Sequence, residues 1–295
     1  MPSEQPDSSS ALPSAPIGFF DSGVGGLSVL DTVFHHLRDE SYLYLADTQH
    51  MPYGERDPQE IVRLAASCLT WLVSQHQVKM LVVACNTASV CLPAMLERPE
   101  YQALKTLPII NPITPTCRWV AEGPYRRVGV IATMATVLSK QYVERIQAAN
   151  PKIEVQQVAC ELLATFIEHG KTHKPLFQSI LEEYLAPLIE WEMDALILGC
   201  THYSHIGQEI RSQLPDSVDI LDPADFIAHE IKQQLKCQGS SSVAEDHVQA
   251  ITFRVTGEPN EFEQVSDELP MKNITVDIVQ AAVVPLILPE TPNTD

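Results

Sequence analysis

The amino-acid sequence predicts an α/β protein of two similar open parallel-sheet α/β domains that face each other across a cleft. Short β-branched and leucine-rich runs alternate with amphipathic helical segments from Ile17 onward, as in parallel sheets covered by helices. The order of strands and helices starts again at Arg127. One apolar run in each half ends on a cysteine and a polar turn, at Cys85 and at Cys200. The two cysteines therefore occupy matching places in the two halves.

Each strand of the first half is predicted from a short apolar run closed by small polar residues. These strands are expected at Ile17 to Phe20, Tyr42 to Ala46 and Met80 to Ala84. Helices are expected after them, at Leu27 to Leu37, from Pro58, and beyond the turn that Cys85 opens. Proline at position 58 suits a helix start, because the first helical residue needs no backbone N–H donor.

The second half repeats this order, with a turn and then a helix after its first strand. Its strands are expected at Val128 to Ile131, Glu154 to Val158 and Ala195 to Leu198. The turn is Ala132 to Thr136, the helix Val137 to Ala149, and further helices fall between Leu162 and Glu192. A strand and a helix follow, at Val218 to Leu221 and Pro223 to Leu235.

The end of the chain is predicted to return to the first domain with extra strands. In order, we expect a polar connection at Cys237 to Asp246, a strand at His247 to Val255, a helix around Glu258 to Glu268, and a strand at Ile274 to Val279. The domains are then 17–113 plus 217–288, and 114–216. Residues 1–16, rich in serine and proline, and residues 289–295 are expected to be disordered tails, because they have almost nothing to bury.

Composition excludes several classes of protein. The 295 residues carry a net charge of −19 with no basic run, which disfavours nucleic acid and anionic membrane as partners. No apolar run approaches the roughly 18–20 residues that span a membrane, and the N-terminus is not a signal peptide. Seven cysteines, an odd number without a C-x-x-C pair, predict no disulfide framework and a reducing, cytoplasmic setting.

The paired cysteines are the strongest indication of chemistry. Ligands of open α/β sheets collect at the carboxyl ends of the strands, where Cys85 and Cys200 are predicted to lie. A thiol near a helix N-terminus can become partly thiolate. Two opposed thiols can remove a proton from one face of a carbon and return one to the other face. A single cysteine in such a place is more often a small buried hydrophobe, but the matched pair favours catalysis.

The segment Asp21-Ser-Gly-Val-Gly-Gly26 joins a predicted strand to a helix. It matches neither the G-x-G-x-x-G fingerprint nor a P-loop with lysine, so nucleotide binding is disfavoured. The segment offers a carboxylate, a hydroxyl and free amides, which suit the ammonium and carboxylate of an amino acid.

The histidines predict a proton carrier rather than a metal site. His169 and His173 have i, i+4 spacing but no further ligands at a recognisable zinc spacing, so no metal is expected. His202 and His205 lie near Cys200, and His202 is the candidate proton carrier or thiol activator. No lysine falls within the motif segments, which argues against pyridoxal phosphate. No cofactor is expected.

Several motifs together resemble the glutamate racemase family, within the Asp/Glu racemases. They are Ile-Gly-Phe-Phe-Asp21-Ser22-Gly-Val-Gly-Gly-Leu-Ser, Ala-Asp47-Thr with Pro52-Tyr53-Gly54, Ala84-Cys85-Asn86-Thr87-Ala88, Val128-Gly-Val-Ile-Ala-Thr133, and Leu198-Gly-Cys200-Thr201-His202-Tyr203. The similarity runs in order from about Ile17 to the late strands. The two cysteine motifs and the Asp-Ser-Gly motif are specific in combination.

The resemblance implies a cofactor-independent interconversion of L- and D-glutamate that supplies D-glutamate for peptidoglycan. It makes Cys85 and Cys200 the acid–base thiols, Cys85 for the proton of the D-isomer and Cys200 for that of the L-isomer. Asp21, Glu168 and His202 complete the implied catalytic group. The implied substrate-contacting positions are Asp21, Ser22, Tyr53, Gly54, Asn86, Thr87, Thr133, Thr136, Thr201 and His202.

Two positions depart from the family pattern beside the expected site. Ser204 and Glu161 stand where the family usually has proline. They put the local loop geometry in question, not the reaction.

Three other functions remain open from the residues alone. An aspartate racemase would share the two thiols and differ in pocket length. A cysteine hydrolase would need one of the two cysteines as nucleophile, activated by His202. An amino-acid-binding module would bind glutamate without isotope exchange. The expected partner is a small-molecule substrate, and the resemblance also allows a homodimer and a cell-wall precursor as allosteric ligand.

Overall fold

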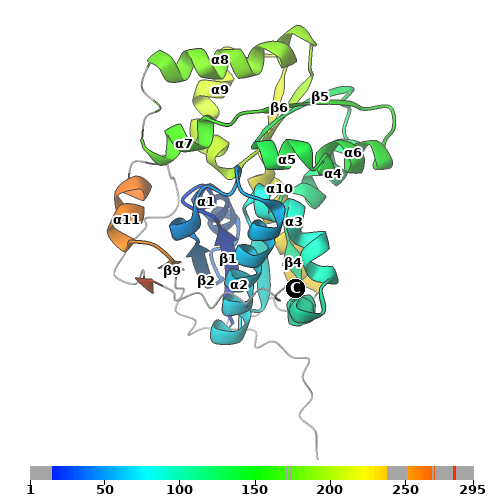
Figure 1. Cartoon of the computed structure of the whole chain (residues 1–295). Coiled ribbons are helices and arrows are strands. Elements are labelled where there is room, and N and C mark those ends of the chain that lie inside the picture. The colour runs from blue at the N-terminus through cyan, green and yellow to red at the C-terminus, as the bar shows by residue number, and fades with distance from the viewer. Residues whose placement is uncertain are drawn as a thin grey trace, which may run out of the picture.

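The computed structural model describes residues 15–170, 172, 175–237, 251–267, 269 and 282–283. They form two β-sheets with helices packed around each (Figure 1). Every strand pair in both sheets is parallel. The predicted α/β class with two open parallel sheets is confirmed. In the part of the chain that the structure describes, no helix combines the length and apolarity that crossing a membrane requires.

The larger sheet has the strand order β10-β9-β2-β1-β3-β4. Its strands are β1 Ile17–Asp21, β2 Tyr42–Ala46, β3 Met80–Val83, β4 Ile109–Ile110, β9 Ile251–Val255 and β10 Ala282–Val283. The three central strands are buried at every position, which explains their continuous apolar sequences. Ile17 is level with Tyr42 on one side and Met80 on the other. The carboxyl ends of these strands therefore meet at one edge.

Helices cover both faces of the larger sheet. On one face pack α1 Leu27–His36, α10 Pro223–Cys237 and α11 Pro259–Asp267. On the other face pack α2 Pro58–His76, α3 Asn86–Glu97 and the short helix η2 Pro99–Thr106. The start of α2 is as predicted: Pro58 is its first residue, and the Asp57 side chain accepts a hydrogen bond from the Gln59 N–H at 2.8 Å.

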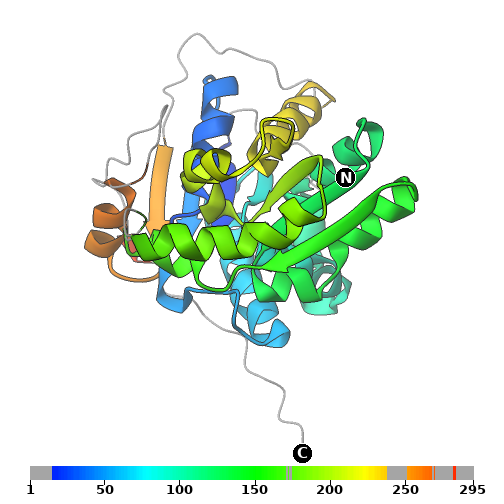
Figure 2. The same ribbon diagram turned by 90° about the horizontal axis from the view of Figure 1, so that it is seen from above.

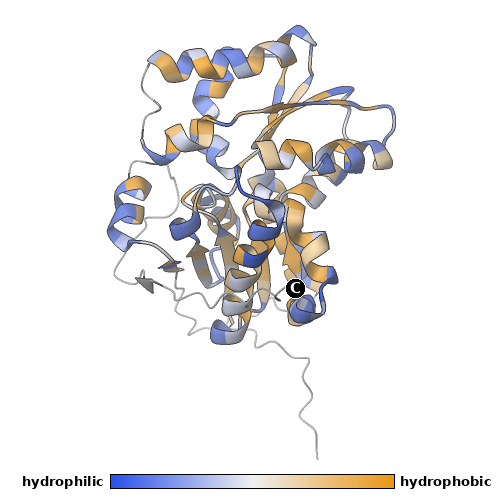
Figure 3. Cartoon of the chain, in the orientation of Figure 1, coloured by the Kyte–Doolittle hydropathy of each residue, from blue (hydrophilic) through white to orange (hydrophobic). Residues whose placement is uncertain are grey.

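The smaller sheet has the order β6-β5-β7-β8. Its strands are β5 Arg127–Ala132, β6 Glu154–Ala159, β7 Ala195–Gly199 and β8 Asp219–Leu221. Its helices are α4 Ile113–Glu122, α5 Met134–Leu138, α6 Gln141–Ala149, α7 Leu163–Glu168, α8 Pro175–Glu190, η3 Thr201–Ile206 and α9 Gly207–Gln213. Seen from above in Figure 2, the green and yellow elements of this sheet lie over the blue and cyan elements of the larger one. Figure 3 shows hydrophobic residues along the central strands of the larger sheet, whereas the edge strand β6 of the smaller sheet is only partly buried.

Some elements differ from the sequence prediction. The helix expected at 137–149 is two helices, because Lys140 adopts a left-handed conformation with φ 55° between α5 and α6. The sequence analysis did not predict α4 or the two-residue strand β4. Strand β8 pairs with β7 in the smaller sheet, whereas the domain boundary predicted at 216/217 assigns these residues to the first domain.

The chain returns to the larger sheet after α10, since β9 lies beside β2. Of the strand expected at 247–255, Ile251–Val255 is seen. The strand expected at Ile274 to Val279 lies outside the described residues, as do the tails at 1–14 and 289–295 and most of the connection at 237–246.

Candidate active site

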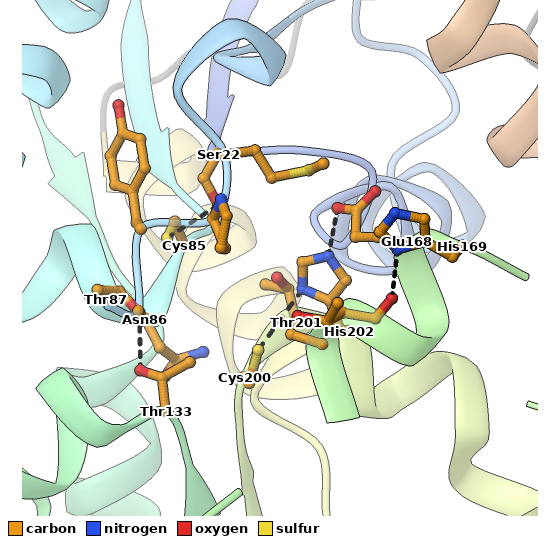
Figure 4. A pocket seen from close by; sticks show the side chains of 16 residues that line it. Ser22, Cys85, Asn86, Thr87, Thr133, Glu168, His169, Cys200, Thr201 and His202 are labelled. Carbon is orange, nitrogen blue, oxygen red and sulfur yellow. Dashed lines mark hydrogen bonds and ion pairs between the residues drawn. The ribbon is translucent and has the colours of Figure 1, made fainter. Parts of the chain in front are cut away.

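One pocket collects residues from the carboxyl ends of strands in both sheets (Figure 4). Cys85 enters it from the end of β3, and Cys200 from the end of β7. The pocket is lined by Ser22, Met51, Pro52, Tyr53, Gly54, Cys85, Asn86, Thr87, Thr133, Ala164, Thr165, Glu168, His169, Cys200, Thr201 and His202. The two thiols thus share one cavity rather than being separated by packed core.

Cys85 is a buried thiol at the start of α3. Its Sγ accepts a hydrogen bond from the Ala88 N–H at 3.4 Å and donates to Ser22 Oγ at 3.7 Å. Burial raises the pKa of Cys85 well above its ordinary value, and the Asp21 carboxylate raises it further. The helix N-terminus and Ser22 oppose this shift without cancelling it. Cys85 is therefore protonated, whereas its place before a helix predicts partial ionisation.

Cys200 has a different partner, the imidazole of His202. Cys200 Sγ lies 3.6 Å from His202 Nδ1, and His202 Nε2 lies 2.5 Å from Glu168 Oε1. Burial alone would lower the pKa of His202, but the Glu168 carboxylate and Cys200 raise it well above the ordinary value. The imidazolium can then donate to the carboxylate through one nitrogen and to a Cys200 thiolate through the other.

Asp21 lies behind the pocket lining rather than in it. Its carboxylate is fully buried, and accepts hydrogen bonds from the Gly23 N–H at 2.9 Å and from Thr201 Oγ1 at 3.2 Å. Burial raises the pKa of Asp21 to about 6, against a lowering by the positive His202. The charge of Asp21 can act on the cavity through Ser22 and Thr201, which do line it.

We expect Asp21→Asn to make stability less dependent on pH. The carboxyl group of Asp21 has a pKa of about 6 in the folded protein and 3.8 in the unfolded chain, so its ionisation lowers the free energy of unfolding as the pH rises from about 4 to 6. The penalty at pH 7 is about 3 kcal/mol at most. Urea denaturation of both proteins at pH 4, 5, 6 and 7 should give a stability difference that grows in favour of the variant with pH. A constant difference would contradict the assignment.

Hydroxyl and amide groups form the wall beside Cys85. Thr87 Oγ1 and Thr133 Oγ1 lie 2.9 Å apart and join the two sheets across the pocket. Thr136 is fully buried behind Thr133, whose hydroxyl donates to Thr136 Oγ1 at 3.1 Å. Thr136 therefore supports the pocket without lining it.

The amide of Asn86 is held by a residue that the sequence analysis missed. The buried Tyr142 of α6 donates from its hydroxyl to Asn86 Oδ1 at 2.7 Å. This bond leaves the amide N–H group of Asn86 to face the pocket. A tyrosine in the middle of an amphipathic helix resembles an ordinary core residue, so the sequence held no signal of this contact.

The loop that carries Tyr53 and Gly54 is held by a buried carboxylate. Asp47 accepts from the hydroxyl of Tyr53 at 2.5 Å, from Thr256 Oγ1 at 2.6 Å, and lies 2.8 Å from His50 Nδ1. The Tyr53 hydroxyl therefore donates its hydrogen bond to Asp47 and not into the pocket. A Cβ at Gly54 would lie 2.9 Å from Thr133 Cβ, so the loop approaches the second sheet closely.

Helix α7, together with the residue that follows it, supplies lining residues in addition to Glu168. Ala164, Thr165 and His169 line the pocket with it. Their spacing of one, three and four residues places them on one helix face, a pattern that could have been read from the sequence. His169 Nδ1 lies 2.7 Å from the Thr165 carbonyl oxygen, and His173, its predicted companion, lies outside the described residues.

The two positions that depart from the family pattern lie at the edge of the site. Glu161 is exposed. Ser204, in η3, hydrogen-bonds to Asp222, which lowers the otherwise raised pKa of that buried carboxyl. Neither residue lines the pocket.

Comparisons with known proteins agree with the sequence motifs. A family model described as Asp/Glu/Hydantoin racemase matches residues 19–231. The glutamate racemase of Rippkaea orientalis is 38% identical over 258 residues, which cover 88% of this chain and 89% of the relative. The structure of glutamate racemase from Francisella tularensis subsp. tularensis SCHU S4 in complex with D-glutamate has a TM-score of 0.82 at 30% identity, covering 93% of this chain and 99% of that chain. The structure of Escherichia coli glutamate racemase in complex with L-glutamate and the activator UDP-MurNAc-ala has a TM-score of 0.67 at 26% identity, covering 85% and 94%.

Proposed function

The chain belongs to the Asp/Glu/hydantoin racemase family, and we propose that it interconverts L- and D-glutamate with Cys85 and Cys200 as the two acid–base groups. The observation that carries this proposal is the entry of both thiols into one pocket from opposite sheets. A hydrolase or a binding protein has no use for a second thiol in that position. The proposal needs no cofactor, since thiols alone exchange the proton.

The surroundings of the two thiols support complementary roles. In each direction one sulfur must be a thiolate that removes the α-proton, while the other is a thiol that delivers a proton. His202 stabilises a thiolate at Cys200, and Ser22 with the Ala88 N–H stabilises one at Cys85. The assignment of Cys85 to the D-isomer and Cys200 to the L-isomer is part of the proposal.

The α-proton of an amino acid is far less acidic than a thiol of pKa about 8.5, so the pocket must stabilise negative charge at the α-carbon. We propose that hydrogen-bond donors on the α-carboxylate do this, among them Asn86, Thr87 and Thr201. The Asp21 carboxylate acts through space on the α-ammonium and keeps it protonated. Such preorganised groups are worth several kcal/mol in a pocket shielded from water.

Isotope incorporation tests the two-thiol mechanism. L-Glutamate racemised in heavy water without added cofactor should gain deuterium in the new D-isomer, while the unreacted L-isomer stays protiated at early times. The reason is that the proton leaves on one sulfur and deuterium arrives from the other. Enantioselective chromatography with mass spectrometry measures both pools. Early labelling of both isomers would instead indicate a single base.

The same assay separates the rival functions. Aspartate in place of glutamate tests the aspartate racemase alternative, which differs in pocket length. Absence of exchange with either amino acid, despite binding, would indicate an amino-acid-binding module. Release of ammonia or a free acid from an amide or ester would indicate a hydrolase with one nucleophilic cysteine.

We further propose that the product D-glutamate serves peptidoglycan synthesis in the cytoplasm. The curated relatives are named for the same reaction. The Escherichia coli protein, in complex with the activator UDP-MurNAc-ala, supports a cell-wall precursor as an allosteric ligand of this chain. A homodimer remains a prediction, which light scattering of the purified protein tests.

A further inference from the structure

The loop between β1 and α1, residues Asp21–Gly26, lies against the ion pair of Glu168 and His202, which belongs to the other half of the molecule. A Cβ at Gly23 would lie 2.3 Å from Glu168 Oε1, and one at Gly25 would lie 2.6 Å from His202 Nδ1. The loop backbone is therefore in direct contact with both members of the ion pair. We call this segment the glycine loop. Its glycines do not cradle a phosphate, and they cover the pair from the side of the larger sheet.

A second histidine of η3 holds the glycine loop from the smaller sheet. His205 is buried, and its Nε2 lies 3.2 Å from the Gly25 carbonyl oxygen. A carbonyl only accepts, so Nε2 carries the proton. Burial and the neighbouring positive His202 lower the pKa of His205 to about 4, so the ring is neutral near pH 7.

The hydrogen bond of His205 differs from the other bonds at this carbonyl. The Ser28 N–H and Ser28 hydroxyl also lie within bonding distance of the Gly25 oxygen, at 3.2 and 2.9 Å. Ser28 belongs to the helix that follows the loop, so these two bonds to the Gly25 oxygen are local, although the Ser28 hydroxyl also lies 3.2 Å from the Thr201 carbonyl oxygen across the cleft. Among the donors to this oxygen that the structure describes, His205 is the one that comes from the opposite sheet.

We propose that His205 is a positioning residue, which latches the glycine loop onto His202 and so keeps the imidazole beside Cys200. The proposal rests on the proposed function, because it assigns His205 a part in activating one of the two thiols. Without the latch, two other bonds still cross the cleft to this loop, from the Val24 N–H to Glu168 Oε1 at 3.3 Å and from Thr201 Oγ1 to Asp21 Oδ2 at 3.2 Å. The Gly25 end of the loop, which lies against His202, is then free to move away from the imidazole. Water then reaches Glu168 and His202 and weakens their interaction, since a higher local dielectric screens the charges.

Two substitutions at one position separate the hydrogen bond from the bulk. His205→Leu removes the donor at similar size, and His205→Gln keeps an N–H donor. Exposed His229 of α10 provides the matched control, His229→Leu. The kcat and KM for both glutamate isomers are measured, together with alkylation rates of Cys200 and Cys85 by iodoacetamide, resolved by peptide mass spectrometry.

We expect His205→Leu to lower kcat by about 10- to 100-fold with little change in KM, because a misplacement of about 1 Å can cost about 100-fold. The ratio of the alkylation rates of Cys200 and Cys85 should fall, since Cys200 alone loses its imidazolium. His205→Gln should restore most of the activity and of the ratio. His229→Leu should match the unmodified protein in both.

Two results would overturn the proposal: an unchanged alkylation ratio with normal kcat in His205→Leu, or equal defects in the Leu and Gln variants with both thiols more reactive. The second would mean general loosening of the cleft. If His205→Leu does not fold, as judged by circular dichroism, His205→Met provides the donor-free comparison. If the unmodified protein does not racemise glutamate, the proposed function fails, while the alkylation ratio still tests the latch.

Discussion

Separate replacement of Cys85 and of Cys200 by alanine is expected to abolish racemisation in both directions while leaving the protein folded. Each sulfur is needed in both directions, once as base and once as acid, so neither can substitute for the other. Loss of a general acid or base typically costs about 100- to 10,000-fold. Conversion of each glutamate isomer, followed by polarimetry or enantioselective chromatography, measures the loss.

Cysteines outside the pocket provide the control for this experiment. Cys237, the exposed cysteine at the end of α10, and Cys117, a buried residue of α4, do not line the pocket. Cys237→Ala should retain full activity, and a thermal denaturation scan should show the two catalytic variants as folded as this control. Substantial racemisation by Cys85→Ala or Cys200→Ala would rule out the two-thiol mechanism.

Replacement of Glu168 by glutamine is expected to lower kcat strongly, by about 100-fold, with a smaller change in KM. The amide preserves size and a hydrogen bond but removes the charge that raises the pKa of His202. Burial then opposes the charged ring with less compensation, so the pKa of His202 falls and the imidazolium stabilises a Cys200 thiolate less well. The titration of His202, followed by NMR of its ring, should move to lower pH in the variant.

A glutamate outside the site tests whether this effect is specific. Glu182 is exposed on α8 and does not line the pocket. Glu182→Gln should leave kcat and the His202 titration unchanged. If Glu168→Gln leaves the His202 titration in place while activity falls, Glu168 acts on the substrate directly instead of through the imidazole.

The glycine loop shows where local sequence arguments reach their limit. Its place between a strand and a helix was predictable from Ile17 to Phe20 and the amphipathic run that follows. Its partners, Glu168 of α7 and His202 of η3, lie far away in the chain, in elements beside the other sheet. The residues of the loop by themselves indicated only a site that binds an amino acid, because a glycine-rich turn exposes free backbone amides. The tight approach of Gly25 to His202 appears only when the two sheets are brought together.

The sequence by itself determined the α/β class, the parallel strands and the position of both cysteines at strand ends. A buried parallel strand is continuously apolar and ends where small polar residues begin, so its bounds can be read from the sequence. The tertiary structure decided the rest. Burial keeps Cys85 protonated although it lies at the start of a helix. The folded arrangement also buries Asp21 behind the pocket lining and pairs Glu168 with His202. It places the hydroxyl of Tyr142 against the amide of Asn86. These effects depend on desolvation and on contacts between distant segments, which only the folded chain creates.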